Sequence, residues 1–241
     1  MQILIDADLV AYRCAASANG EPQEIAVLRC DKLMRQLIEE TNATSYRAFL
    51  SGDKNFRKEI DPEYKANRKD QEPPIWLQHC REFLITEWKA EVQDGIEADD
   101  ALGINQSADT TIVSLDKDLL QVPGNHYRWS ISGTTPTGKT WVKDAEHLNI
   151  GEFDGLVTFY TSSLVGDTSD NISGIHGLGP VKAKKHLSGA TTEQELFDIC
   201  RALYNDDERY FKNLKLLWVL RDEARVFNPE ERGLLLDDAM D

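Results

Sequence analysis

The residues from 165 to 185 place two kinds of chemistry next to each other. Asp167 and Asp170 are three positions apart, so a helical turn would put both carboxylates on one face, where they suit a hard divalent cation. A glycine-rich turn follows and leads into a predicted helix with Pro180 near its first position. Backbone N–H groups at such a helix start bind anions, and lysines follow within one turn. The pairing of a metal site with a phosphate site is typical of nucleases.

The rest of the chain alternates between strand and helix patterns, which predicts an α/β fold with a mostly parallel central sheet flanked by helices. Short apolar or β-branched runs predict strands over 3–5, 45–50 and 110–115, and helical periodicity covers 25–39. Further helices are predicted over 9–16, 75–87, 153–164, 181–187, 193–203 and 208–225. Another helix is predicted to begin at 97–102. Short strands are predicted over 127–131 and 139–142.

These elements predict three parts of the chain. Residues 1–160 form the α/β core, 161–225 form a helical module, and 226–241 form an acidic C-terminal segment. Within the core, residues 54–73 combine six Lys or Arg residues with five acids and show weak periodicity. This composition suits a mobile loop or a short arch better than a packed element.

Acidic residues follow the predicted central strands, and one pair opens the helix at 97–102. Ligands of open α/β sheets bind beyond the carboxyl ends of the strands, so these acids are expected to meet in one crevice. The residues expected there are Asp6, Asp53, Asp99, Asp100, Asp116 and Asp118, joined by Asp167 and Asp170. So many carboxylates need bound cations, and oxygen ligands without His or Cys favour Mg²⁺ or Mn²⁺. Two such ions could activate the attacking water and stabilise the leaving oxygen.

Each motif also has a simpler interpretation. A single acid after a strand is commonly a helix cap, and Glu97 with Asp100 fits a capping box. Asp8 is interpreted as the N-cap of the helix that follows the first strand. The glycine turn could be an ordinary helix–helix connection, and the lysines at 182–185 a solvated face. The acids gain weight as a set, through their position along successive elements.

Bulk properties limit the functional classes. The formal net charge is −15, which is unusual for a protein that binds nucleic acid, although bound cations would neutralise part of it. Four widely spaced cysteines without a CxxC pair predict free thiols in a reducing cytosol. No apolar run reaches the length of a membrane span, and the N-terminus lacks the pattern of a signal peptide. We therefore expect a cytoplasmic protein without a membrane partner.

Four sequence blocks together resemble the 5′-nuclease superfamily, which includes flap endonucleases, phage 5′–3′ exonucleases and the nuclease domain of bacterial DNA polymerase I. They appear in the family order: Phe56-Arg57 with Pro62 to Arg68, Glu97-Ala98-Asp99-Asp100, Leu115 to Gln121, and Val165 to Asn171 with Gly174 to Pro180. The resemblance implies a PIN-like core, a helix-hairpin-helix (helix-3-turn-helix) module and a metal-dependent nuclease. The short chain is similar to the stand-alone phage enzymes.

The resemblance also implies roles for individual residues. Two metal ions would be held, directly or through water, by Asp6, Asp53, Glu97, Asp99, Asp100 and Asp116 at a tighter site, and Asp118, Asp167 and Asp170 would complete a weaker one. Lys65 and Arg68 would be the catalytic, positively charged residues at the base of the arch, where they grip and polarise the scissile phosphate. The duplex backbone would be held by Gly177, Gly179, Val181, Lys182, Lys184 and Lys185, at a turn where relatives also bind K⁺. Asp53 departs from the family pattern because it lies only three residues before Phe56.

The leading hypothesis is therefore a 5′–3′ exonuclease or flap endonuclease that acts in DNA replication or repair. It would cut DNA phosphodiesters at or near a 5′ end, nick or flap, as a monomer in a bacterial or phage-infected cell, with replication proteins as candidate partners. The first alternative is a haloacid-dehalogenase-type phosphatase with Asp6-Ala7-Asp8 as its nucleophile motif. The others are a non-catalytic DNA-binding protein of the same fold and a small toxin-like ribonuclease.

Overall fold

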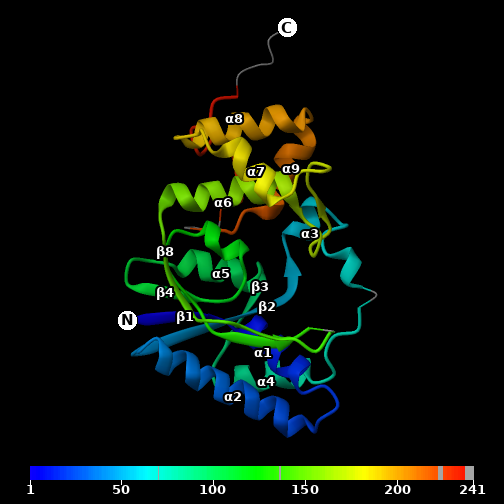
Figure 1. Cartoon of the computed structure of the whole chain (residues 1–241), viewed down its shortest axis with the longest axis vertical. Coiled ribbons are helices and arrows are strands. Elements are labelled where there is room, and N and C mark those ends of the chain that lie inside the picture. Colours follow the sequence, from blue (N-terminus) through cyan, green and yellow to red (C-terminus); the bar gives the residue numbers. More distant parts are fainter. Residues whose placement is uncertain (70, 136, 222–224, 237–241) are drawn as a thin grey trace.

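A computed structural model describes residues 1–69, 71–135, 137–221 and 225–236. Its centre is a six-stranded sheet with the order β3-β2-β1-β4-β5-β8 (Figure 1). The strands are β1 (Gln2–Asp6), β2 (Ser45–Asn55), β3 (Glu91–Gly95), β4 (Thr110–Val113), β5 (Gly124–Arg128) and β8 (Glu146–Ile150). Neighbouring strands are parallel except β5 and β8, which run antiparallel. The predicted α/β fold with a mostly parallel sheet is confirmed.

Helices cover both faces of this sheet. In Figure 1, α1 (Ala7–Ser17), α2 (Gln23–Glu40) and α4 (Leu77–Thr86) lie below the sheet, and α5 (Ala98–Asn105) lies above it. Side chains alternate along β1, so that Ile3 and Ile5 pack with the lower helices while Leu4 packs with Phe49 and Leu102 on the other face. Burying each such side chain contributes about 1.5–3 kcal/mol. The carboxyl ends of the parallel strands are thereby held at one edge of a fixed sheet.

A second apolar cluster holds the helical part of the chain together. It joins α6 (Glu152–Val165), α7 (Pro180–Leu187), α8 (Glu193–Tyr204) and α9 (Asp207–Leu217). Phe159 of α6 is fully buried in this cluster, and Phe227 and Leu234 of the C-terminal segment pack into it as well. The predicted domain boundary at residue 160 falls within α6, and residues 237–241 of the predicted acidic segment lie outside the described residues.

The helix predicted over 208–225 ends early, at Leu217. The Arg57 guanidinium donates to the carbonyl oxygens of Leu216 and Trp218, at 2.8 and 2.7 Å. The Gln121 side chain bonds the Leu217 carbonyl and the Val219 N–H, both at 3.0 Å. These tertiary bonds satisfy the backbone in an extended conformation, so helix propensity does not decide this stretch.

The segment predicted as an arch contains two short helical stretches, α3 (Arg57–Ile60) and a 3₁₀ turn at Ala66–Arg68. It bonds to the short hairpin formed by β9 (Gly166–Asp167) and β10 (Ile172–Ser173). The Lys65 N–H donates to the Asp170 carbonyl at 2.9 Å, and the Asn67 side chain donates to the Thr168 carbonyl at 2.8 Å. The 54–73 segment therefore connects the α/β core to the helical part of the chain.

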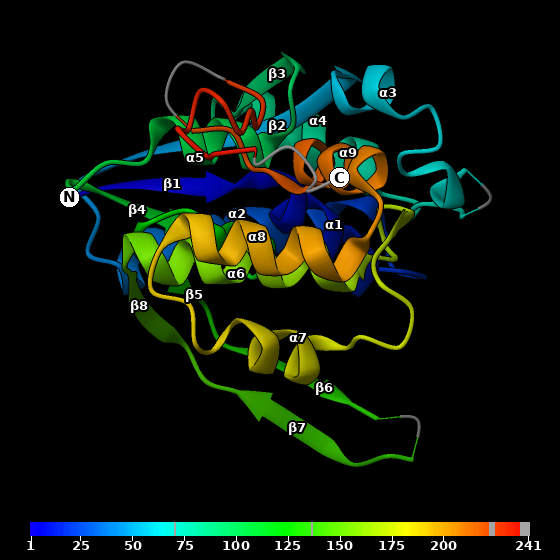
Figure 2. The same cartoon turned by 90° about the horizontal axis from the view of Figure 1, so that it is seen from above.

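A separate hairpin, β6 (Ile131–Thr134) with β7 (Thr140–Lys143), projects away from the body of the molecule (Figure 2). In the described part of the chain, no helix is long and apolar enough to cross a membrane. Cys14, Cys30, Cys80 and Cys200 are all buried free thiols.

Candidate active site

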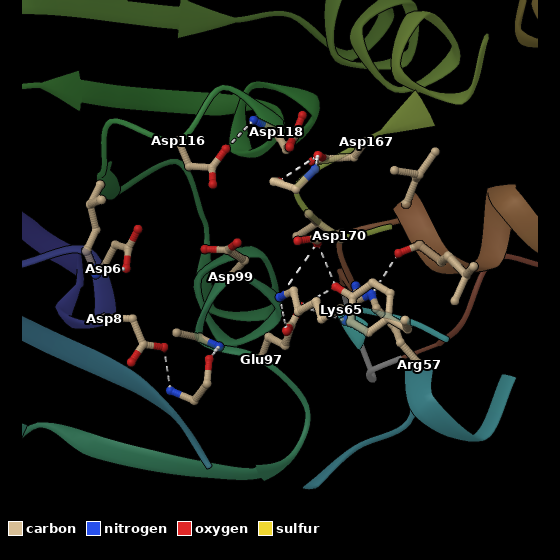
Figure 3. A pocket seen from close by; sticks show the side chains of 18 of the residues that line it. Asp6, Asp8, Arg57, Lys65, Glu97, Asp99, Asp116, Asp118, Asp167 and Asp170 are labelled. Atoms are coloured by element: carbon tan, nitrogen blue, oxygen red, sulfur yellow. Dashed lines mark hydrogen bonds and ion pairs between the residues drawn. The ribbon is translucent and has the colours of Figure 1, made fainter. Parts of the chain in front are cut away.

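Carboxylates gather in a cavity of about 400 Å³ at the carboxyl edge of the sheet, which we call the acidic cavity (Figure 3). They come from four separate parts of the chain: the start of α1, the start of α5, the loop after β4, and the β9–β10 hairpin. The acids that line it are Asp6, Asp8, Glu97, Asp99, Asp116, Asp118, Asp167 and Asp170. The predicted convergence of acids at this edge is thus present in the structure.

The first wall is built by the neighbouring parallel strands β1 and β4. Asp6 ends β1 and caps α1: its Oδ1 accepts from the Leu9 N–H at 3.0 Å, and its Oδ2 accepts from the Ser114 hydroxyl at 2.7 Å. Ser114 directly follows β4 and also accepts from the Asp116 N–H at 3.0 Å. The Asp118 N–H in turn donates to Asp116 at 2.8 Å. A chain of hydrogen bonds therefore orients three acids from two strands.

The second wall is the β9–β10 hairpin, which needs glycine at two positions. Gly166 has a φ of +75°, and a Cβ there would lie 2.2 Å from the Gly174 nitrogen. A Cβ on Gly174 would lie 2.1 Å from the Val165 carbonyl carbon. This close approach turns the chain sharply after α6 and aims Asp167 and Asp170 into the acidic cavity.

The third wall carries both acids and cations. Glu97 caps α5, and Asp99 lies in its first turn. Lys65 forms an ion pair with Glu97 and lies 3.6 Å from Asp170, and Arg68 pairs with Asp170 at 2.5 Å. The predicted cations of the arch therefore lie at the rim of the acidic cavity, next to the acids.

Burial and mutual repulsion raise the pKa of several of these acids. Burial, opposed by hydrogen bonds from Leu9 and Ser114, raises the pKa of Asp6 to about 7. Burial and the charge of Asp116 raise the pKa of Asp118 to about 7. The pKa of Asp99 is raised well above its ordinary value by burial and by the charges of Asp6 and Asp116. Without a bound cation, the site therefore favours the protonated form of Asp6, Asp99 and Asp118.

Asp167 behaves differently from its neighbours. Burial raises the pKa of Asp167, but hydrogen bonds from the Ser169 hydroxyl and N–H, at 2.6 and 2.7 Å, outweigh it and leave the pKa lowered. Burial raises the pKa of Asp170, although Lys65 and Arg68 oppose that shift. The hairpin therefore carries one carboxylate with a lowered pKa, Asp167, and one that is paired with Lys65 and Arg68, Asp170.

The donor set fits hard divalent cations, because it consists of carboxylate oxygens whose repulsion a cation would relieve. In the part of the chain that the structure describes, no group of three or more Asp, Glu, His or Cys side chains is close enough together to hold a metal ion as it stands. Coordination would therefore require side-chain adjustment around the cavity, which the exposed rim of the hairpin permits.

Two of the acids predicted as metal ligands do not line the acidic cavity, which corrects the predicted set. Asp53 is exposed, because β2 continues past a register shift between Ser51 and Asn55 and turns this side chain away. Asp100 is fully buried behind the cavity wall, where Arg57 bonds both of its oxygens, at 2.6 and 2.8 Å. Its carboxylate also accepts from the Glu97 N–H, at 3.0 Å, so that it supports the start of α5.

Among the polar residues of the cavity that were not predicted as site residues, Asp8 and Tyr64 make contacts that shape it. The N-cap of α1 is Asp6 rather than Asp8. The Asp8 carboxylate instead accepts from the Ser51 N–H at 2.7 Å and pairs with Arg81. The Tyr64 hydroxyl lies 2.9 Å from both Glu97 and Asp170, and so bridges the core and the hairpin. The Asp-Ala-Asp spacing was a signal for Asp8, whereas Tyr64 carried no signal beyond its place in the family block.

The predicted duplex-binding turn lies outside the acidic cavity, at the start of α7. Gly177 has a φ of +76°, and Gly179 is the N-cap of α7 with Pro180 at the first helical position. The side chains predicted to contact DNA are exposed, and the Lys182 ammonium donates to the Gly177 carbonyl at 3.3 Å. In Figure 1, α7 lies in the upper, helical part of the molecule, between α6 and α8.

Comparison with known proteins places this geometry in a family. Residues 1–147 match the family described as 5′-3′ exonuclease, N-terminal resolvase-like domain, and the chain belongs to that family. It is 30% identical over 199 residues to DNA polymerase I of Chloroflexus aurantiacus, covering 73% of this chain and 21% of that protein. It is 28% identical to an exodeoxyribonuclease of Enterobacteria phage T3, covering 73% of this chain and 63% of that protein. The chain thus spans less than two thirds of these two relatives.

Solved structures agree on the fold. The 5′-exonuclease of phage T5, in a structure titled for bound zinc ions, aligns with a TM-score of 0.66 at 18% identity and covers 90% of this chain and 89% of its own. The T5 flap endonuclease, in a structure titled as a complex with DNA and metal ions, aligns with a TM-score of 0.64 over 90% of this chain and 88% of its own. The comparisons do not favour the phosphatase or the non-catalytic alternative.

Proposed function

We propose that the protein is a metal-dependent 5′-nuclease that hydrolyses DNA phosphodiesters at or near 5′ ends, as an exonuclease, a flap endonuclease or both. The observation that carries the proposal is the convergence of eight carboxylates on one cavity with Lys65 and Arg68 at its rim. Membership of the 5′-3′ exonuclease family supports it, as do relatives named 5′-3′ exonuclease in Buchnera aphidicola and Mycoplasma genitalium.

In this proposal the acids divide into two groups that would hold two divalent ions, Mg²⁺ or Mn²⁺. Asp6, Glu97, Asp99 and Asp116 would hold the ion nearest the sheet, and Asp118, Asp167 and Asp170 would hold the ion nearest the hairpin; all seven side chains line the acidic cavity. When bound, such ions supply Lewis acidity toward a phosphate and lower the pKa of water. Asp53 and Asp100 are omitted because their side chains lie outside the acidic cavity. The zinc ions bound to the T5 5′-exonuclease and the metal ions in the T5 flap endonuclease complex support metal dependence.

Lys65 and Arg68 have the role of holding and neutralising the scissile phosphate. Their ion pairs with Glu97 and Asp170 support this role, because they hold both cations beside the acids of the cavity. A guanidinium matches two phosphate oxygens, and an ammonium acts as a point charge. Charge that develops on the phosphate in the transition state would strengthen both contacts.

The turn before α7 would hold the duplex at a distance from the acidic cavity. Gly177, Gly179 and the N–H groups of Val181 and Lys182 would contact backbone phosphates, and Lys184 and Lys185 would add charge. A K⁺ ion at the carbonyls of this turn belongs to the same proposal. Monomeric action on a DNA duplex with a nick, flap or free 5′ end is part of the same proposal, and it is supported by the acidic cavity and this turn both being built from the described residues of one chain.

A cleavage assay tests the proposal. Purified protein would be incubated with 3′-labelled duplexes that carry a nick, a recessed 5′ end or a 5′ flap, with Mg²⁺ or with a chelator. We expect metal-dependent products that end in a 5′ phosphate. Replacing Asp116 or Asp167 with Asn should abolish them and leave the circular dichroism spectrum unchanged, because both side chains project into the cavity.

Glu39→Gln is the matched control, because Glu39 is an exposed acid at the end of α2 and far from the cavity lining. It should retain full cleavage. Full activity in both Asn variants would overturn the assignment of the site. If the wild-type protein binds duplex DNA but does not cut it in Mg²⁺ or Mn²⁺, the protein is a non-catalytic DNA-binding protein and the proposal is wrong.

A further inference from the structure

A second cavity, of about 450 Å³, lies against the acidic cavity, and we call it the basic cavity. The two cavities share Ser51, Tyr64, Lys65, Arg68 and Glu97 as a common wall. The cations that line the basic cavity are Lys54, Lys58, Lys65, Arg68 and Lys69. Asp53 and Glu97 are its acidic residues, so positive charge dominates. A protein with a net charge of −15 has concentrated five cations beside its proposed cleavage site.

The cations on the outer side of the basic cavity are weakly engaged by the protein itself. Lys54 lies 3.4 Å from Asp94 in a pair whose side chains are 79% and 63% exposed, which leaves the ammonium largely available. Lys58 and Lys69 are exposed and make no ion pair within the part of the chain that the structure describes. Lysines that outnumber the acids around a concave surface attract anions from solution.

Backbone structure holds this cavity in shape. A Cβ on Gly52 would lie 2.4 Å from the Gln93 carbonyl oxygen, so glycine lets β2 approach β3 closely at the register shift. That approach turns the outer end of β2, with Asp53 and Lys54, toward α3 and its Lys58. Lys65 has a φ of +57°, which directs the chain back across the shared wall. The exposed lysines are thus anchored on a strand, a helix and a turn that the core fixes.

We propose that the basic cavity binds the phosphate group on the 5′ side of the cleavage point, an inference that rests on the proposed function. The scissile phosphate would lie in the acidic cavity at Lys65 and Arg68, so the neighbouring phosphate of the same strand would cross the shared wall. A volume of 450 Å³ falls within the range of about 300–1,000 Å³ for small-ligand sites. A terminal phosphate carries a charge of about −1.5 to −2 at neutral pH, which suits the three outer lysines, Lys54, Lys58 and Lys69, better than a single diester charge does.

The same chemistry has two sources, the terminal phosphate of a recessed 5′ end and the first phosphodiester of a 5′ flap. Binding without cleavage separates them. Fluorescent hairpin duplexes would be titrated in a chelator and their anisotropy measured for four ends: recessed with a 5′ phosphate, recessed with a 5′ hydroxyl, and a short flap with either group. The variants are Lys58→Glu with Lys69→Glu, and Lys32→Glu as the control on the far face of α2.

We expect the wild-type protein to bind the recessed phosphorylated end about ten-fold more tightly than the recessed hydroxyl end. The double variant should lose this preference and keep its affinity for the hydroxyl end, whereas Lys32→Glu should keep both. This result assigns the cavity to a terminal phosphate. If instead the hydroxyl flap binds as tightly as the phosphorylated end and both weaken in the double variant, the cavity takes an internal phosphate.

Two results would overturn the inference. One is equal wild-type affinity for all four ends. The other is a loss of affinity in the double variant that is the same for every end, or no greater than the loss in Lys32→Glu. In that case the lysines contribute only non-specific electrostatic attraction. Failure of the proposed function is distinguishable, because it appears as absent cleavage in Mg²⁺ whatever the end preference. Thermal unfolding of each variant checks that these exposed substitutions leave the fold intact.

Discussion

Arg57 and Asp100 form a bidentate ion pair in the interior, with nitrogen–oxygen distances of 2.6 and 2.8 Å and side chains that are 4% and 0% exposed. The pair joins three parts of the chain. Arg57 starts α3, Asp100 belongs to the first turn of α5, and the Arg57 guanidinium also bonds the Leu216 and Trp218 carbonyls at the end of α9. A buried charge pair thereby ties the wall that carries Glu97 and Asp99 to the helical part of the protein.

Replacing Asp100 with Ala should strongly destabilise the fold. The substitution leaves the Arg57 charge buried without a partner, which typically costs about 3–5 kcal/mol. At about 2–4 °C per kcal/mol for a chain of this size, Tm should fall by about 6–20 °C. The matched control is Asp31→Ala, which removes an exposed pair with Arg35 at 2.8 Å and should change Tm little. Equal effects of the two substitutions in thermal unfolding would contradict the structural role of Asp100.

The acids of the cavity should make metal-free stability depend on pH. The pKa of Asp118 is raised to about 7 in the folded protein from an ordinary value of 3.8, mainly by burial. Between these values the folded state binds more protons than the unfolded state, so the contribution of Asp118 to stability falls as pH rises. Asp6 has the same sign and nearly the same range. We expect Asp118→Asn to raise the Tm of the chelator-treated protein at pH 8 more than at pH 5.

Divalent ions should reverse this trend. Protons compete with cations for the same oxygens, so Mg²⁺ should raise the wild-type Tm more at pH 8 than at pH 5. Asp118→Asn should reduce that gain, while Glu39→Gln, an exposed control, should keep it. Differential scanning fluorimetry across pH, with and without metal, measures both effects. If the metal-induced increase in Tm is the same at pH 5 and pH 8, these carboxyl groups do not bind the metal.

Part of the fold could be predicted because its apolar pattern is strong. The spacing of Cys30, Met34 and Leu37 predicts the helix at 25–39, and α2 spans Gln23–Glu40. In contrast, the edge strands β3 and β8 were not predicted, because their residues alternate between half-buried and exposed positions and are largely polar. Their pairing depends on neighbouring strands rather than on an apolar run of their own.

The candidate site shows the same division. The acids Asp6 and Asp116 could be placed because they follow adjacent parallel strands, whose carboxyl ends meet. Asp99 and Asp100 are adjacent in the sequence, yet they face different ways from the helix, and the partner that holds Asp100 is Arg57, 43 residues away. Asp53 is displaced by a register shift that no local pattern announces. Long-range partners and strand irregularities are therefore what sequence reasoning could not supply.

Gly174→Ala should disrupt the β9–β10 hairpin and the site with it. A Cβ at this position would lie 2.1 Å from a carbonyl carbon of the Val165 backbone, which no side-chain rotation can relieve. The hairpin must shift, and Asp167 and Asp170 shift with it, so we expect lower Tm and a loss of metal-dependent cleavage. Gly189→Ala is the matched control, because nothing lies within 4 Å of a Cβ there. Normal cleavage by Gly174→Ala would show that the hairpin tolerates a different path.

Replacing Lys182 and Lys184 with Ala should weaken binding to duplex DNA and flatten its dependence on salt. Both side chains are exposed on α7, outside the two cavities at the cleavage site. Each phosphate contact contributes a slope of about 0.9 in the logarithm of affinity against the logarithm of salt concentration, so the double variant should lose a slope of up to about 2. Anisotropy titrations over a range of salt concentrations in a chelator measure it.

The position of α7 also predicts how this loss differs from the loss caused by changes at the basic cavity. The Lys182 and Lys184 substitutions should lower affinity equally for phosphorylated and hydroxyl 5′ ends, because α7 contacts the duplex backbone and not the end. The cleavage rate at saturating DNA should stay close to that of the wild type, since the acidic cavity keeps all of its carboxylates. A salt slope that matches the wild type would move the duplex-binding surface away from α7, whereas a fall in the saturated rate would place α7 closer to the reacting phosphate.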